Sequence, residues 1–359
     1  MFSIKPLPAL AYKPGHTLTE DPTMNRRTSL AALLVAALLA AAPAFAQQPI
    51  VIKFSHVVAK DTPKGKAADY FAKIVAEKTA GRVKVEVYPN SQLYKDGEEM
   101  EALQLGAVQM LAPSLAKFGP LGVPDFEAFD LPYIFDNYDE LHKVTMGPIG
   151  KSMLKKLEPK GIVGLAYWDN GFKDFSANKP LHVPADFKGL KMRIQSSKVL
   201  DSEMRALGVN PQVMAFSEVY QALQTGVVDG TENPPSNFYT QKMHEVQKYM
   251  LRSQHGYLGY ALIANKKFWD NLPADLRKTI DECIVEATNY GNDIAKKEND
   301  DSVEAVRKSG KTTIIVPTAA ERLEMKKALV KVHKEHEGRI GAELIKSIYK
   351  ETGFDPAAL

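Results

Sequence analysis

The sequence predicts an α/β protein with largely parallel sheets. Apolar runs with the spacing of strands alternate along the chain with segments that have the spacing of amphipathic helices. Glycines follow several helical segments, where a left-handed residue would end a helix. Residues 101–108 and 221–228 resemble each other at an offset of 120, each as a helix end, a glycine and the start of a strand. This repeat favours two comparable α/β lobes, with chance similarity of so common a unit as the alternative.

The expected elements follow in order from Pro49. In residues 82–88 the valines at 83, 85 and 87 share one face, as in a half-buried strand. Strands are predicted at 51–55, 82–88, 108–112, 162–167, 190–194 and 312–316. Helices are predicted at 65–79, 98–105, 197–207, 217–224, 274–308 and 319–349, several of them followed by a glycine.

The C-terminal third is predicted to be mainly helical. Residues 274–308 contain no proline and keep apolar side chains on one face. A continuous helix of this length would extend roughly fifty ångströms at ~1.5 Å per residue. It would have to cross both lobes or bend, and Gly291 is its weakest point. The second segment, 319–349, is interrupted by Gly341.

Residues 24–46 have the features of a secretory signal peptide. Arg26 and Arg27 follow Met24, an apolar run occupies 30–42, and Ala44-Phe45-Ala46 provides a small-x-small cleavage site. We therefore expect export with cleavage after Ala46, the alternative being an anchor that is retained. Met24 is the expected true start, so residues 1–46 are assigned no part in the fold.

Composition excludes several classes of function. The chain is 45% hydrophobic and 25% charged, as in soluble globular proteins. Residues 1–46 hold four basic and two acidic side chains, so the remainder has 42 basic and 41 acidic ones. This near-neutral balance gives no reason to expect a nucleic-acid partner. Cys283 is the only cysteine of the chain, which rules out an internal disulfide.

The sequence contains no recognisable catalytic constellation. It has no GxSxG elbow and no zinc-ligand spacing, and Ser309-Gly310-Lys311-Thr312 lacks the first glycine of a phosphate loop, because Ala305 stands there. We therefore expect neither an enzyme nor a bound cofactor or metal.

Polar and cationic residues instead gather where strands are expected to end. Arg193 lies within an apolar run, and a strand-end arginine can hold a carboxylate by two parallel hydrogen bonds. In open α/β sheets the ligand crevice lies beyond the carboxyl ends of the strands. The candidates are Lys60, Ser114, Lys117, Asn170, Lys173, Arg193 and Asn233, with Trp168, Phe172, Phe216 and Tyr257 as aromatic neighbours. This set suits a small anionic ligand, although each lysine alone is also compatible with a solvated surface.

Four stretches carry a family resemblance: VEVYPNSQL (85–93), NGFKDFSANKPL (170–181), GLKMRIQSS (189–197) and MAFSEVYQALQTGVVDGTENPPSNF (214–238). They resemble the substrate-binding subunits of tripartite ATP-independent periplasmic (TRAP) transporters, especially the branch that binds C4-dicarboxylates. The likeness extends in the same order over about residues 50–355.

The resemblance implies a two-lobed periplasmic binding protein fold, with a hinge and a long helix that spans both lobes. Lobe I would comprise 47–170 plus about 259–298, and lobe II 171–258 plus about 299–359. The protein would be a periplasmic monomer that binds succinate, fumarate or malate and passes it to membrane subunits driven by an ion gradient. Another organic acid (2-oxo, aromatic or sugar acid), or a role as ligand-binding input to a sensor, is the alternative.

The resemblance also implies individual roles. Arg193 and Asn233 match residues that contact a ligand carboxylate, and Phe216 matches an aromatic wall. Asn170 to Lys173 matches a segment in which many relatives end with arginine, so a bidentate grip from Lys173 is not expected. Ser114 and Lys117 match ligand-side positions of the other lobe, and Lys60 is placed on the loop after the first strand. Tyr257 is included as an aromatic neighbour.

Overall fold

The computed structural model describes residues 48–359. The predicted signal peptide and its cleavage site after Ala46 lie outside the described residues. Within residues 48–359, no helix has both the length and the apolar character needed to cross a bilayer.

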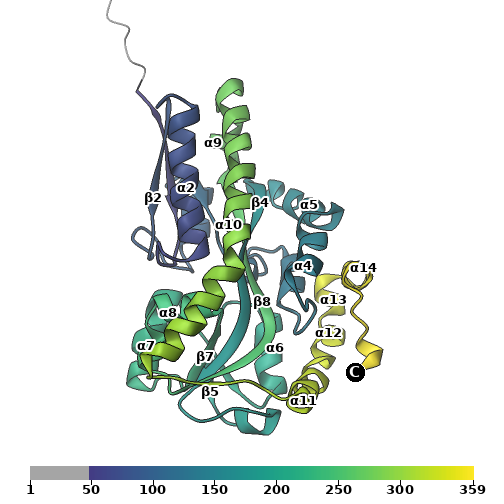
Figure 1. Cartoon of the computed structure of the whole chain (residues 1–359). Coiled ribbons are helices and arrows are strands. Elements are labelled where there is room, and N and C mark those ends of the chain that lie inside the picture. The colour runs from purple at the N-terminus through teal and green to yellow at the C-terminus, as the bar shows by residue number, and fades with distance from the viewer. Residues whose placement is uncertain (1–47) are drawn as a thin grey trace, which may run out of the picture. The chain divides into compact units, whose positions relative to one another are not determined.

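One mixed sheet of nine strands runs through the described part of the chain (Figure 1). Its order is β2-β1-β3-β8-β4-β7-β5-β6, and β9 pairs with β8. The strands are β1 (Ile50–Ser55), β2 (Val83–Tyr88), β3 (Met110–Leu111), β4 (Ile162–Ala177), β5 (Lys191–Ile194), β6 (Asn210–Val213), β7 (Gly230–Asn233), β8 (Tyr249–Asn265) and β9 (Thr313–Ile315).

The predicted parallel arrangement holds at both ends of the sheet but not at its centre. Strand β1 is parallel to β2 and β3, and β5 is parallel to β6 and β7. Strand β8 is antiparallel to β3 and β4, and β4 is antiparallel to β7. The two parallel groups are thus joined by one long antiparallel pair that passes from one group to the other.

This central pair is also where the predicted elements were wrong. Strand β4 runs ten residues beyond the predicted end at Tyr167, and β8 was not predicted at all. Nearly every residue of β8 is buried, so the sequence lacks the polar–apolar alternation of a half-exposed strand. Gly256 and Gly259 in β8, and Asn170-Gly171 in β4, have the composition of turns.

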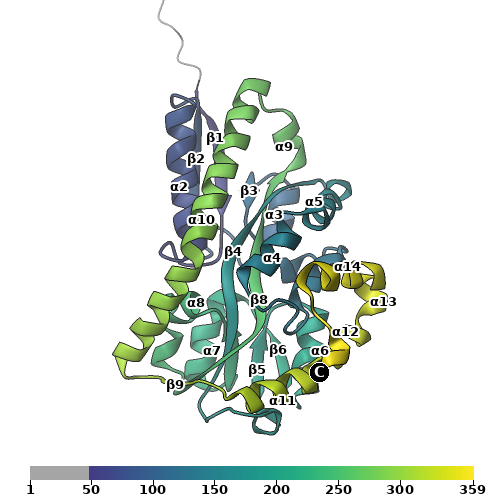
Figure 2. The ribbon, with the colours of Figure 1, turned by 45° about the vertical axis from the view of Figure 1, so that its right-hand side comes forward.

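Helices cover both faces of the sheet (Figure 2). They are α2 (Pro63–Lys78), α3 (Glu99–Gln104), α4 (Tyr138–Thr145), α5 (Pro148–Lys155), α6 (Lys198–Ala206), α7 (Val219–Thr225), α8 (Pro235–Thr240), α9 (Lys266–Asp270), α10 (Ala274–Ser309), α11 (Ala319–Leu329), α12 (Lys331–Glu335), α13 (Glu337–Ile340) and α14 (Ala342–Thr352). The predicted C-terminal helix 319–349 is therefore divided into four shorter ones.

Helix α10 confirms the predicted long helix and runs without interruption along β4, from the side of α2 to that of α8 (Figures 1 and 2). It does not break at Gly291. A Cβ atom there would lie 2.9 Å from Cβ of Ala67, so the glycine instead lets α10 approach α2 closely. The helix ends at Gly310, whose φ of 66° is left-handed.

Separate hydrophobic clusters fill the two ends of the sheet. Phe54, Phe71 and Ile284 belong to a cluster formed by β1, α2 and α10. Phe187 and Leu200 belong to another, which packs on β5 and α6. The fold is thus two-lobed, as predicted. The C-terminal helix α14 packs Ile345 and Ile348 into a third cluster together with residues of α4 and α5.

The contact at Gly291 yields the first prediction. Gly291→Leu should lower the free energy of unfolding by about 1–3 kcal/mol, because the larger side chain has to separate α10 from α2. Urea unfolding followed by circular dichroism measures this. Val285→Leu, at an exposed position of the same helix, is the control and should change little. Equal stability of the two variants would contradict the proposed close contact.

Candidate functional site

Two adjoining cavities lie between the lobes, at the carboxyl ends of β1, β3, β5 and β7. The inner cavity has a volume of ≈ 20 Å³, enough for about one water molecule. The outer cavity has ≈ 240 Å³. Asp96, Lys117, Arg193 and Gln195 line both. The inner cavity is also lined by Val57, Val58, Ser114, Phe216, Asn233, Asn237, Leu258 and Tyr260. The structure therefore brings Arg193, Asn233, Phe216, Ser114 and Lys117 together.

Arg193 is held in place by the strand that carries it. Met192 and Ile194 on either side of it are fully buried in β5, and Arg193 itself is 2% exposed. Its Nε donates a hydrogen bond of 3.0 Å to the carbonyl of Met214. Its guanidinium carbon lies 5.7 Å from the centre of the Phe216 ring. The guanidinium is thus preorganised, with nitrogen atoms left for an anion.

Asp96, on the loop between β2 and α3, provides a carboxylate beside this arginine. One of its oxygens lies 3.8 Å from Nη2 of Arg193, and the carboxylate accepts hydrogen bonds from Lys117 and from the backbone N–H of Phe216. Burial disfavours ionisation of Asp96, but the charges of Lys117 and Arg193 outweigh it and lower the pKa to about 2. Asp96 is therefore ionised at neutral pH.

Lys117 and Ser114 extend the site into the other lobe. Lys117, in the short 3₁₀ helix η1 (Leu115–Lys117), also pairs with the buried Glu99 at 2.5 Å. Burial alone would lower the pKa of Lys117, but Asp96 and Glu99 raise it. The hydroxyl of Ser114 donates to the side-chain carbonyl of Gln195, just after β5. The contact between Ser114 and Gln195 joins the lobes across the inner cavity.

Asn170 lies behind the cavity and connects four elements. It is the extra residue of a β-bulge, because Asp169 pairs with Gly259 and Gly171 with Leu258. Its amide donates to Asn237 at 2.9 Å and to the Tyr260 hydroxyl at 2.7 Å. Its side-chain oxygen accepts from Ser236 in α8, and its backbone carbonyl from Asn299 in α10. Asn170 thus fixes Asn237 and Tyr260, which do line the cavity.

The structure does not bring Lys173 to either cavity. Its ammonium is fully buried, 2.6 Å from the carboxylate of Glu232. Burial alone would lower the pKa of Lys173, but Glu232, Glu203 and Asp130 raise it. His255 lies 3.7 Å from Glu232 and 3.8 Å from Glu203. We call Asp130, Lys173, Glu203, Glu232 and His255 the buried charge cluster.

Two further predicted residues also lie outside the cavity lining. Lys60 is exposed, on the loop before α2. Tyr257 is buried, where its hydroxyl donates to Asp169 at 2.6 Å and its ring packs against Phe135 and Phe172.

Sequence reasoning missed Asp96, Gln195, Asn237 and Tyr260. Gln195 lies two residues after Arg193 in the same motif, and Asp96 closely follows the VEVYPNSQL motif. A search for every polar residue just beyond a strand end would have found Gln195, but not Asp96, which lies eight residues beyond the end of β2.

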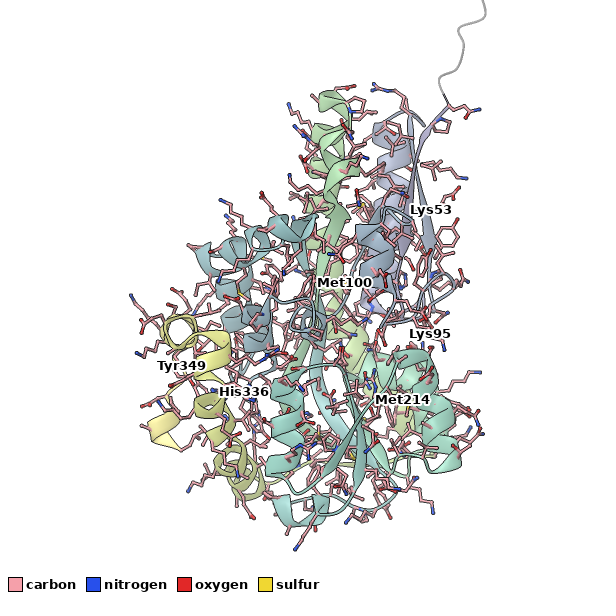
Figure 3. All side chains as sticks on the ribbon, turned by 180° about the vertical axis from the view of Figure 1, so that it is seen from behind. Lys53, Lys95, Met100, Met214, His336 and Tyr349 are labelled. Atoms are coloured by element: carbon pink, nitrogen blue, oxygen red, sulfur yellow. The ribbon has the colours of Figure 1, made fainter. Side chains whose placement is uncertain are left out.

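A charged contact lies at the mouth of the site. Lys95 Nζ is 2.9 Å from Glu218, and both side chains are about half exposed. Figure 3 labels Lys95 and Met214, which lie on facing segments of the two lobes. Met214 lines the outer cavity. The lobes therefore touch at the surface as well as inside.

The arrangement matches a known family. The family described as Bacterial extracellular solute-binding protein, family 7, matches residues 54–339. The chain belongs to this family.

Individual relatives agree with this assignment to the solute-binding family. The C4-dicarboxylate-binding periplasmic protein DctP of Rhodobacter capsulatus is 64% identical over 332 residues, which cover 92% of this chain and 99% of that protein. A TRAP solute-binding protein of Sulfurospirillum deleyianum with bound succinate has a TM-score of 0.82 at 46% identity, covering 84% of this chain and 99% of that one. A TRAP solute-binding protein of Pseudomonas aeruginosa with bound L-malate has a TM-score of 0.78 at 41% identity, covering 80% of this chain and 100% of that one. The predicted family and fold class are confirmed.

The buried charge cluster predicts a strong effect on the stability of this solute-binding protein. Lys173→Met should lower the free energy of unfolding by about 3–5 kcal/mol, because it leaves buried carboxylates without their cation. Chemical unfolding at neutral pH measures it, with the exposed Lys179→Met as control. A loss no greater than that of the control would show that the Lys173–Glu232 pair carries no such stabilisation.

The pH dependence of stability tests the same cluster. Burial, with Glu232 and Asp130 nearby, raises the pKa of Glu203 from 4.5 to about 8. The folded protein then holds this proton more tightly than the unfolded chain, so the stabilisation is present at low pH and is lost as the pH rises through about 8. We expect the free energy of unfolding to fall between about pH 5 and about pH 8, and to fall less steeply in Glu203→Gln. Identical slopes for the two proteins would contradict this assignment.

Proposed function

We propose that this protein is a periplasmic receptor for C4-dicarboxylates such as succinate, fumarate and malate, which it delivers to a TRAP membrane transporter driven by an ion gradient. One observation carries the assignment to a carboxylate ligand. The buried carboxylate of Asp96 accepts hydrogen bonds from Lys117 and from the backbone N–H of Phe216, and it forms an ion pair with Arg193. A cleft that already holds one carboxylate in this way has the groups that a carboxylate ligand needs.

The relatives support the same ligand class. The Sulfurospirillum protein carries succinate and the Pseudomonas protein L-malate, and the Rhodobacter relative is named for C4-dicarboxylates. Succinate and malate differ by one hydroxyl group. The amide and hydroxyl groups of Gln195, Ser114 and Tyr260 around the cavity suit both.

In this proposal Arg193 and Asn233 hold one carboxylate, and Lys117 with Ser114 addresses the other. Phe216 forms the aromatic wall. Asn170, Lys173 and Tyr257 support the site from outside the lining, through the contacts described above. Arg193 and Lys117 line both cavities, so a ligand that reaches from the inner into the outer cavity stays within range of each.

The lobes are proposed to move about the centre of the sheet. Lobe I comprises 47–170 plus about 259–298, and lobe II 171–258 plus about 299–359. The crossings then fall within β4, β8 and α10, which run through both lobes. The ligand favours the closed arrangement only by the contacts that it makes better there. Export with cleavage after Ala46 would place the receptor, as a monomer, in the periplasm, where it binds without turning its ligand over.

Identification of the ligand tests the proposal directly. The protein purified without added ligand is denatured, and the released small molecules are identified by mass spectrometry. A thermal-shift panel of succinate, fumarate, malate, a 2-oxo acid, an aromatic acid and a sugar acid follows. Ligand at about a hundred times its dissociation constant should stabilise the fold by about 2.7 kcal/mol. Stabilisation by a sugar acid or an aromatic acid and by no C4 acid would reject the proposed ligand class.

Arg193 provides the mutational prediction. Arg193→Ala should weaken succinate binding by about 100-fold or more, because two charged hydrogen bonds of about 1.5–3 kcal/mol each are lost. Arg193→Lys should recover only part of the affinity, because an ammonium cannot form the bidentate pair.

Isothermal titration calorimetry measures these affinities, and far-ultraviolet circular dichroism confirms that each variant is folded. Arg205→Lys, an exposed arginine in the helix after β5, is the control. Unchanged affinity in Arg193→Ala would remove Arg193 from the binding site.

A further inference from the structure

Lys64 is a buried cation next to the inner cavity that has no assigned role. It lies in the first turn of α2 and is 1% exposed. Its ammonium donates to the carbonyl of Ala112 at 2.9 Å and lies 3.7 Å from the centre of the Tyr260 ring. No carboxylate among residues 48–359 lies within 4 Å of it. Tyr260 lines the inner cavity and Lys64 does not, so the ammonium acts on the cavity across the aromatic ring.

The position is unfavourable for a lysine in two respects. The N-terminus of a helix carries a partial positive charge, which favours acidic side chains, and α2 has none in its first turn. Burial without a carboxylate partner adds a desolvation penalty for the charged form. Residues that break local rules in this way commonly serve a function.

The groups that face Lys64 form an unbalanced set of charges. They come from the loop after β1, the segment around the start of α3, η1 and β8, and they are His56, Asp96, Glu99, Lys117 and Tyr260. Glu298 of α10 pairs instead with Lys66, at a more exposed place on α2. Asp96 and Glu99 offset the charges of Lys117 and Arg193, which leaves the charge state of Lys64 to decide the balance. A ligand with two carboxylates adds two negative charges beside this set.

We propose that Lys64 makes the cleft selective for doubly charged ligands, by taking up a proton when the second carboxylate binds. This rests on the proposed dicarboxylate function. The proton passes from solvent to Nζ of Lys64, and no bond of the ligand changes. A monocarboxylate held by Arg193 brings one charge fewer and needs no such uptake. Lys64 acts through Tyr260 and is a positioning and charge-balancing residue, not a direct ligand contact.

The charge state of Lys64 in the free protein fits this role. Burial, aided by the charge of Lys117, lowers the pKa of Lys64 to about 7. Above that pH the free receptor holds the neutral amine, and a bound dianion favours the ammonium. The affinity for a dicarboxylate should therefore fall as the pH rises above about 7, by up to about tenfold per pH unit.

The first experiment measures the proton in the unmodified protein. Succinate is titrated calorimetrically at about pH 8 into the wild type, in two buffers that differ in ionisation enthalpy. The expected result is uptake of close to one proton per succinate. Binding of succinate without proton uptake would overturn the proposal for Lys64 while leaving the dicarboxylate function intact. No binding of succinate by the wild type would reject both.

The second experiment uses Lys64→Met, which keeps an unbranched side chain one atom shorter and removes the titrating group. The exposed Lys73→Met on the same helix is the matched control. Succinate should bind about tenfold more weakly or worse to Lys64→Met, and without proton uptake, because the balancing charge is absent. Succinamate, in which an amide replaces one carboxylate, is measured by competition. Its affinity for Lys64→Met should be less than about twofold below its affinity for the wild type.

These outcomes separate a charge role from a packing role. Equal losses of succinate and succinamate affinity would assign Lys64 to packing and overturn the proposal. Proton uptake that persists in Lys64→Met would assign the proton to another group, such as Glu99, and overturn it as well. Thermal melting of each variant without ligand verifies that the fold is retained.

Discussion

The antiparallel ladder between β4 and β8 is the constraint on which the cleft depends. It begins where Ile162 pairs with Asn265 and ends where Ala177 pairs with Tyr249, so the same two strands belong to both lobes. The bulge at Asn170 interrupts it beside the inner cavity. Gly171 allows α10 to approach, since a Cβ there would lie 2.7 Å from the Asn299 amide. Asn299 in turn binds Asn170 and Ser236, so strand, long helix and cavity wall are fixed at one point.

Two groups of buried charges lie on either side of this ladder. They differ in whether the attraction of nearby cations or the cost of burial determines the pKa of their carboxyl groups. Around the cavity, Asp96 lies between Lys117 and Arg193, and its depressed pKa shows that attraction outweighs desolvation. In the buried charge cluster the single cation Lys173 faces three carboxylates, and burial raises the pKa of Asp130 to about 7 and that of Glu203 to about 8. At neutral pH Glu203 therefore mostly holds a proton and Asp130 is partly protonated, which limits the negative charge of this cluster, while the cavity keeps its cations.

The sequence indicated the site where strand ends and motifs coincide. Arg193 and Asn233 met both conditions, and the structure places them in one cavity. Lys60 was chosen because it lies on the loop after the first strand, but its side chain is exposed to solvent. Thr62 caps helix α2, which begins at Pro63. Lys64 therefore lies in the first turn of the helix, where its side chain is buried. A lysine in a first helical turn has no sequence pattern that distinguishes burial from exposure. Strand β8 was missed because burial on both faces removes the alternation of polar and apolar residues. Tyr260, which lies in β8, and the antiparallel centre of the sheet were missed for the same reason.

The contacts between the lobes also explain how a ligand can control closure. The Lys95–Glu218 pair is half exposed, so solvent screening leaves it little power to hold the lobes together. The inner contacts are buried and therefore less screened by solvent, but they use the same donors that a ligand carboxylate would use. Asp96 occupies Lys117, Arg193 and the Phe216 N–H when the cavity holds no more than about one water molecule. An arriving carboxylate therefore shares or displaces bonds that already exist. Its preference for the closed state is only the difference between the two sets of contacts, and charge balance around Lys64 is one term that a monocarboxylate cannot supply.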